Sequence, residues 1–201
     1  DNFSAINLYG NNSSFTGTFI TKLRSGQHRL GFMVPEAGSA NAYWLLDAVG
    51  VDCHRIMFSS GVLEFGALSG RGGFRQNVAG TPIIRIGALN ANTNFGGSFA
   101  NASGTLSIEK IGTGTQIFSG NSTHTGTTTI LNGTFLLNNG SNGSYSSPIV
   151  VKNGAFGGSG KSTGTLTVGS STDTSSQAFL VPGTDGTIAA FTTTNAILNA
   201  N

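Results

Sequence analysis

Residues 108–140 read IEKIGTGTQIFSGNSTHTGTTTILNGTFLLNNG, and this stretch decides the expected fold. Runs of β-branched and aromatic residues, such as Thr127–Leu131 and Thr134–Leu137, alternate with short segments rich in Gly, Asn and Ser. Such runs are typical of β-strands, and the Asn132-Gly133 dipeptide between them is a turn signal. The stretch therefore predicts several short strands joined by tight turns.

The rest of the chain has the same pattern, with further strand-like runs at residues 83–87 and 165–169. An amphipathic helix needs apolar residues at i, i+3, i+4 and i+7, and this spacing is nearly absent. Residues 40–51, around Trp44, are the one stretch that could hold a helical turn. The sequence predicts an all-β protein.

Repetition favours a solenoid over a sandwich or a closed barrel. A Gly-Thr pair followed by apolar alternation returns at spacings near 10, 20 and 30 residues, beginning at Gly104, Gly114, Gly133, Gly164 and Gly186. A surface of Thr, Ser and Asn also suits stacked parallel strands, because like hydroxyls and amides can hydrogen-bond where like charges would repel. We expect a parallel solenoid of about eight to ten coils of ~20–25 residues. Its inward-facing side chains should include Leu106, Ile108, Ile130, Phe135 and Leu137.

The composition argues against a nucleic-acid-binding or a membrane-binding protein. Only 9% of the 201 residues are charged, the net charge is +2, and the charges are scattered singly. The nearest approach to a basic cluster is Arg71, Arg75 and Arg85, which is too sparse for a nucleic-acid surface or a polybasic membrane patch. No apolar run reaches the ~20 residues that span a bilayer. Cys53 is the single cysteine, so an intrachain disulfide is excluded. The start at Asp1 rather than Met suggests a removed leader, and a sequence cut from a longer chain would begin in the same way.

Short motifs follow one another in a specific order within residues 108–140. They are Lys110, Gly112-Thr113-Gly114-Thr115, Ser119-Gly120, a turn from Asn121 to Gly126, a strand from Thr127 to Ile130 and a strand from Gly133 to Leu137. This order resembles the autotransporter-associated β-strand repeat, also called the passenger-associated transport repeat. His124 departs from the family pattern, which favours an aromatic residue such as Tyr there. Gln116 stands where an apolar residue is usual, and we expect it to loosen the packing at that corner.

The resemblance extends more weakly over residues 60–201, whereas residues 1–60 match only loosely. We expect a single solenoid domain over residues 1–201. The resemblance implies a right-handed parallel β-helix in an exported bacterial protein, and it implies no catalytic residues. It therefore places the chain outside the cell or on its surface.

Three other patterns allow chemistry in principle. Residues 155–162, AFGGSGKS, match a relaxed phosphate-binding loop, but a strand rather than a helix should follow, so we expect a Gly-rich corner. Cys53 and His54 are adjacent on an expected strand and should face opposite ways, which predicts a buried thiol beside a surface histidine. Polysaccharide lyases and hydrolases also use parallel β-helices, but they need clustered carboxylates. Asp47 and Asp52 are the only two of the eight acids close in sequence.

The preferred function is a non-catalytic extracellular structural protein, without cofactor or metal, that associates with itself into a filament or surface layer. The alternative is a surface adhesin fragment that binds a glycan or a host protein on a lateral face; a polysaccharide-cleaving enzyme ranks third.

Terminal coils expose unpaired backbone groups that can pair with a strand of another chain. The expected assembly interface is the apolar set at the two ends of the chain: Phe3, Ile6, Leu8, Phe15, Ile188, Phe191, Ile197 and Leu198. Exposed aromatic side chains grouped on one lateral face would favour the adhesin instead.

Overall fold

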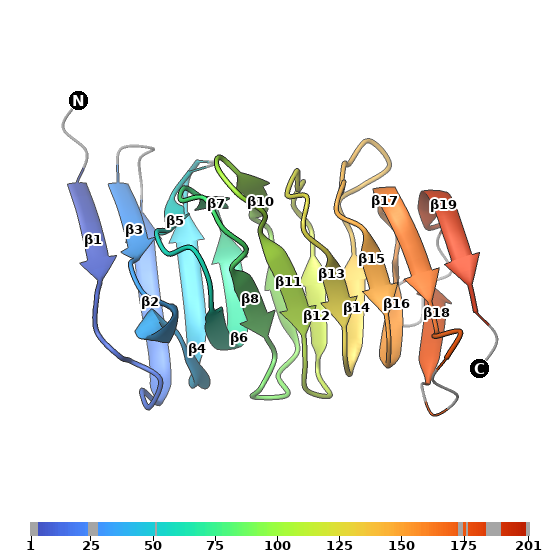
Figure 1. Ribbon diagram of the computed structural model, residues 1–201, viewed down its shortest axis with the longest axis horizontal. Coiled ribbons are helices and arrows are strands. Elements are labelled where there is room, and N and C mark those ends of the chain that lie inside the picture. The colour runs from blue at the N-terminus through green and yellow to red at the C-terminus, as the bar shows by residue number, and fades with distance from the viewer. Residues whose placement is uncertain are drawn as a thin grey trace.

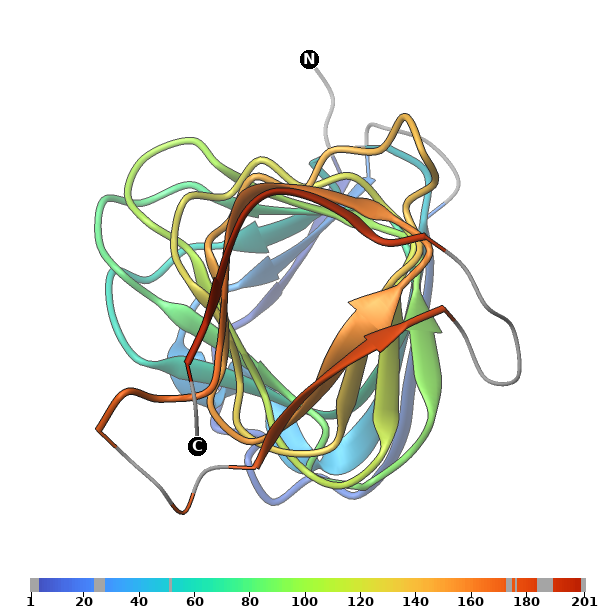
Figure 2. The same ribbon diagram turned by 90° about the vertical axis from the view of Figure 1, so that its right-hand side faces the viewer.

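The computed structural model describes residues 4–23, 28–50, 52–172, 175, 177–183 and 190–199. The chain winds into a parallel β-solenoid of about seven turns, stacked along one axis (Figure 1). β1 (Ser4–Leu8) lies at one end of the stack and β19 (Thr192–Leu198) at the other. Seen along the axis in Figure 2, successive turns overlie one another around a common core.

The wall has three faces, and not every turn places a strand on each of them. Face 1 contains β1, β3 (His28–Phe32), β5 (His54–Ile56), β7 (Gly73–Gln76) and β10 (Ser98–Asn101). Face 2 contains the first half of β6 (Val62–Arg71), β8 (Ile83–Ile86), β11 (Ser107–Lys110), β13 (Thr128–Ile130), β15 (Ile149–Val151), β17 (Lys161–Val168) and β19. Face 3 contains β2 (Gly17–Leu23), β4 (Ser39–Ala48), the second half of β6, β9 (Thr93–Phe95), β12 (Thr115–Phe118), β14 (Thr134–Leu137), β16 (Gly154–Gly158) and β18 (Ala178–Pro182). The described strands pair in parallel throughout.

The structure confirms the expected strands within residues 106–137. β11 pairs with β13 and β12 with β14, both in parallel register. All five side chains expected to point inward are fully buried: Leu106, Ile108, Ile130, Phe135 and Leu137. The right-handed sense of the winding stays a prediction.

The expectation of eight to ten coils was wrong, because some turns are longer than 25 residues. In the last turn the Thr194 hydroxyl donates to the Thr163 carbonyl, 31 positions earlier. The Asn199 side chain reaches the Gly169 carbonyl, 30 positions earlier.

The helical turn considered for residues 40–51 was also wrong. This stretch contains β4, which pairs with β2 and β6. Trp44 points into the core at 1% exposure, whereas Tyr43 and Leu45 face outward and stay partly exposed. The described helix nearest to it is a single 3₁₀ turn, η1 (Pro35–Ala37).

Aromatic rings form a continuous column along the core. Successive rings have centroids 5.2–6.0 Å apart, within the favourable range for aromatic pairs. The members, each under 2% exposed, are Trp44, Phe65, Phe74, Phe95, Phe118, Phe135 and Phe156. This column fills the space between the three faces and supplies much of the apolar burial that stabilises the fold.

Asparagine side chains join neighbouring turns at the corners. Asn90 Oδ1 accepts the backbone N–H of Thr113 at 2.7 Å, and Asn92 Oδ1 accepts that of Thr115 at 2.8 Å. Asn101 also donates its amide to the Thr125 hydroxyl at 2.7 Å. The expectation that surface amides and hydroxyls bond along the stack is confirmed at these positions.

Candidate functional site

Lys110 lies at the end of β11, and its side chain holds the corner that follows this strand. Its side chain lies inside the wall at 1% exposure. Nζ donates to the carbonyls of Ile111 at 2.6 Å and Gly112 at 2.9 Å, and to Asn132 of the next turn at 3.3 Å. Burial lowers the pKa of this ammonium group to about 8. The lysine thus ties the corner of one turn to the next and has a structural role.

His124 points into the core rather than outward from its turn. Its Nε2 lies 3.2 Å from the Thr128 hydroxyl, which in turn bonds Tyr145 Oη at 2.7 Å and Ser147 Oγ at 2.9 Å. The ring stands edge-on between Phe99 and Tyr145. Burial lowers the pKa of His124 to about 3, so the ring is neutral at physiological pH.

Gln116 is buried at 1% exposure and satisfies both ends of its amide. Its Oε1 accepts from the Thr93 hydroxyl of the previous turn at 2.8 Å, and its Nε2 donates to the Ile117 carbonyl at 3.0 Å. A buried polar group with its bonds made carries little penalty. These contacts argue against the loosened corner expected from the sequence.

Residues 108–137 match the Passenger-associated-transport-repeat family. The match covers one repeat of 30 residues in a chain of 201. Within the repeat, Lys110 forms the corner and Gly133 approaches the Gly112 carbonyl too closely for a side chain. The searches of curated proteins and of solved structures found no match.

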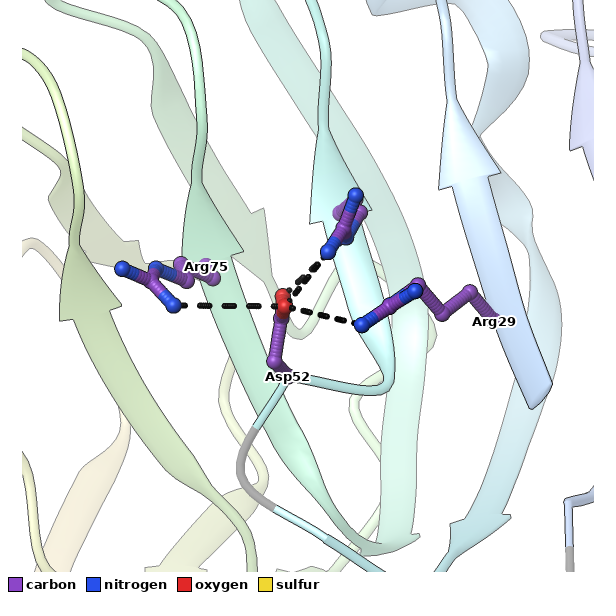
Figure 3. A network of polar contacts seen from close by, with 4 residues as sticks. Arg29, Asp52 and Arg75 are labelled. Atoms are coloured by element: carbon purple, nitrogen blue, oxygen red, sulfur yellow. Dashed lines mark hydrogen bonds and ion pairs between the residues drawn. The ribbon is translucent and has the colours of Figure 1, made fainter. Parts of the chain in front are cut away.

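A cluster of three arginines surrounds one carboxylate on face 1 (Figure 3). Arg55 holds Asp52 through two bonds, Nε to Oδ1 at 3.2 Å and Nη2 to Oδ2 at 2.6 Å. Arg29 Nη2 and Arg75 Nη1 approach the same Oδ2 at 3.6 and 3.9 Å. The three guanidinium groups come from β3, β5 and β7, that is, from three successive turns.

A surface hollow of about 310 Å³ adjoins this cluster. Its floor is Gly31, which leaves a gap in the outward row of side chains between Asn7 on β1 and Arg55 on β5. Two methionine side chains and two arginines complete the lining: Met33, Met57, Arg29 and Arg55.

The arginines singled out in the sequence do not form one basic cluster. Arg71 pairs with Asp47 at 2.7 Å on face 3. Arg85, on face 2, is held between Glu64 at 3.3 Å and Glu109 at 2.8 Å. Only Arg75 belongs to the cluster around Asp52.

The phosphate-loop-like segment is part of the solenoid wall, and the Cys53-His54 pair is part of the core. Residues 155–162 run from β16 through a corner into β17, the strand that was expected in place of a helix. Cys53 is buried, which raises the pKa of its thiol. His54 is fully buried too, so the surface histidine expected there was wrong: Cys53 lies at the corner before β5, where strand alternation does not apply.

Among the described residues, no three His, Cys, Asp or Glu side chains gather as a metal would require. No helix in the described part of the chain has the length and hydrophobicity needed to cross a membrane.

The described members of the expected assembly interface lie at the two ends of the stack. Ile6 of β1 is 54% exposed, and Ile197 and Leu198 of β19 are 46% and 68% exposed. Leu8 is partly buried, and Phe15, between β1 and β2, is 38% exposed.

Phe191 is only partly exposed, because its ring packs edge-on against Phe156 at 5.0 Å. Phe3 and Ile188 lie outside the described residues. Ile20 of β2 is 55% exposed, and the sequence reasoning missed three further exposed apolar side chains on the uncharged terminal strand β18: Phe179, Leu180 and Val181. Their signal was the same apolar content in uncharged strands that marked the residues that were named.

Proposed function

We propose that this chain is a non-catalytic structural segment of a secreted or surface-exposed protein, and that it stacks end to end on copies of itself. The passenger-associated transport repeat implies a passenger β-solenoid that is exported or displayed at the surface. One observation carries the proposed stacking: the two end strands of face 3, β2 and β18, both expose apolar side chains in the same register.

The inward row of face 3 begins and ends on apolar side chains. Phe19 of β2 pairs with Trp44, which pairs with Leu68. At the other end, Phe135 pairs with Phe156, which pairs with Leu180 of β18. If a second copy continued this ladder, its Phe19 would cover Leu180 of the first, which is 41% exposed in the single chain.

The same register brings the outward side chains of the ends together. Ile20 follows Phe19 and Val181 follows Leu180, so the two would lie side by side across the junction. They are 55% and 44% exposed in the single chain. β1, β18 and β19 carry no charged side chain and β2 carries only Lys22, so these four strands bring no like charges together. Such a head-to-tail contact propagates into a filament unless its rotation closes a ring.

The exposed aromatic side chains support assembly over an adhesin. Tyr9, Phe15 and Phe179 are the large exposed aromatics in the described residues, and they lie beside or on terminal strands rather than grouped on one lateral face.

A cysteine pair tests the junction. In a Cys53→Ala background, Ile20→Cys and Val181→Cys place two thiols on strands about 4.8 Å apart, within the range that a disulfide bridges. Mild oxidation should then yield a ladder of covalent multimers on a non-reducing gel. Lys22→Cys with Val181→Cys is the matched control, because it shifts one thiol two residues along the strand. Monomers only, or equal ladders from both pairs, would refute the proposed register.

A further inference from the structure

The hollow over Gly31 and the arginines beside it lie outside the face 3 junction proposed above. The hollow lies on the lateral wall, on face 1, and Asn7, Gly31 and Arg55 form its outward row. We propose that it binds a saccharide that carries a carboxylate or a sulfate group.

The charge of the cluster favours an anion. Arg55 and Arg75 stand directly opposite each other on neighbouring strands, an arrangement in which like charges destabilise a sheet. Asp52 is the single carboxylate that the described contacts place between them. The other described ion pairs differ: Arg71 pairs with Asp47, and Arg85 lies between two carboxylates, Glu64 and Glu109. Among these described ion pairs, arginines outnumber carboxylates only in the cluster around Asp52.

Arg55 has donors to offer a ligand. A guanidinium group carries five N–H donors, and Asp52 accepts from two nitrogens of Arg55, Nε and Nη2. The side chain is 31% exposed and borders the hollow. A carboxylate or sulfate fits the planar fork of arginine through two parallel bonds, which are stronger than bonds between neutral groups.

The remaining lining fits a sugar ring rather than a bare ion. Met33 and Met57 present soft apolar surface for the C–H groups of a ring, and Asn7 presents an amide for a hydroxyl. The volume of about 310 Å³ lies at the lower end of the range for small-molecule sites.

A side chain at Gly31 would enter the hollow. A Cβ added there would meet the end of the Asn7 side chain and, at 3.2 Å, Met33 Sδ. Asn7 is exposed and its side chain can move, so Gly31→Val places a branched side chain in the hollow and narrows it without changing the charge of the site. Arg55→Gln removes the charge and leaves the hollow.

The test measures binding by titration calorimetry or by NMR shift changes, using glucuronate, glucose 6-sulfate, glucose and inorganic sulfate as probes. We expect at least one of the two acidic sugars to bind at least tenfold more tightly than glucose or sulfate, and the stronger of the two identifies the oxyanion. Gly31→Val and Arg55→Gln should each weaken it at least tenfold. Arg71→Gln, which removes the same charge from face 3, should change it less than twofold.

Thermal unfolding of each variant shows that it is folded, and the two site variants alter the hollow by independent means. No binding of either acidic sugar at millimolar concentration would overturn the proposal. Three other results would also overturn it. Inorganic sulfate could bind as tightly as the acidic sugars, folded Gly31→Val could bind them as tightly as the wild type, or Arg71→Gln could lose as much affinity as the two site variants.

Discussion

Phe118 and Phe135 lie on neighbouring strands of face 3 with ring centroids 5.5 Å apart and ring planes 12° apart. Each ring also contacts Tyr145 edge-on, so the pair is enclosed on the side of face 1. Because one repeat of 30 residues supplies both phenylalanines, the repeat carries its own section of the aromatic column.

Removing one ring from this column should destabilise the protein strongly. Phe135→Ala should lower the free energy of unfolding by about 3–5 kcal/mol, because it leaves a cavity that the flanking rings cannot fill. Phe135→Asp should cost more, since it buries a charge. Urea unfolding measures both. Phe179→Ala, at a 56% exposed site, should change stability by less than about 1 kcal/mol, and equal losses at the two sites would contradict the buried column.

Acid should destabilise the fold through its two buried histidines. Burial lowers the pKa of His54 and of His124 to about 3, against 6.5 for an ordinary histidine. The unfolded chain therefore binds more protons between those values. Above pH 6.5 neither histidine lowers the free energy of unfolding. As the pH drops from 6.5 towards 3, each histidine lowers the free energy of unfolding by about 1.4 kcal/mol per pH unit.

His54→Phe isolates this effect. The His54 ring packs against Phe74 at 4.9 Å, and neither of its nitrogens has a hydrogen-bond partner among the described residues. The variant should match or exceed the wild type at pH 7 and lose less stability between pH 6.5 and 4, as urea midpoints would show. His28→Phe, at an exposed position, is the control and should keep the wild-type slope. A wild-type slope in His54→Phe would mean that the histidine is not buried.

The corner lysine should be required for stability. Lys110→Met keeps the length of the side chain and removes the three bonds to carbonyl oxygens, so we expect a loss of about 2–4 kcal/mol. Lys152→Met, at an exposed site, should cost less than about 0.5 kcal/mol. Similar losses in both variants would remove the structural role assigned to Lys110.

A stacked glycine corner gives a further test. A Cβ on Gly120 would collide with the backbone carbonyl of Gly97 in the previous turn, whereas a Cβ on Gly10 meets nothing within 4 Å. Gly120→Ala should therefore cost about 2 kcal/mol or more, because backbone must move. Gly10→Ala should be neutral or slightly stabilising. Equal thermal midpoints for the two variants would show that the turns are not in close contact at this corner.

The solenoid could be predicted from the sequence because its signals are local. Alternation identified Ile108 and Phe135 as inward-facing, and the Gly-rich segment at 155–162 indicated a corner. β4 was missed because Tyr43, Trp44 and Leu45 are all large and apolar, which hides the alternation that the strand follows.

The arginine cluster could not be found from the sequence. Arg29, Arg55 and Arg75 are separated by corners of unequal length, and only the register between turns brings them to Asp52. The burial of His54 likewise depends on the corner at Asp52 and Cys53, directly before β5. Both features depend on pairing between turns, which no single stretch of sequence specifies.

Electron microscopy of the purified chain over a range of concentrations tests the central claim most directly. The account predicts unbranched filaments in which parallel strands continue through each junction at ~4.8 Å spacing, with a subunit repeat on the order of 35 Å for about seven turns. Monomers that persist at high concentration, or copies that associate side by side, would contradict it.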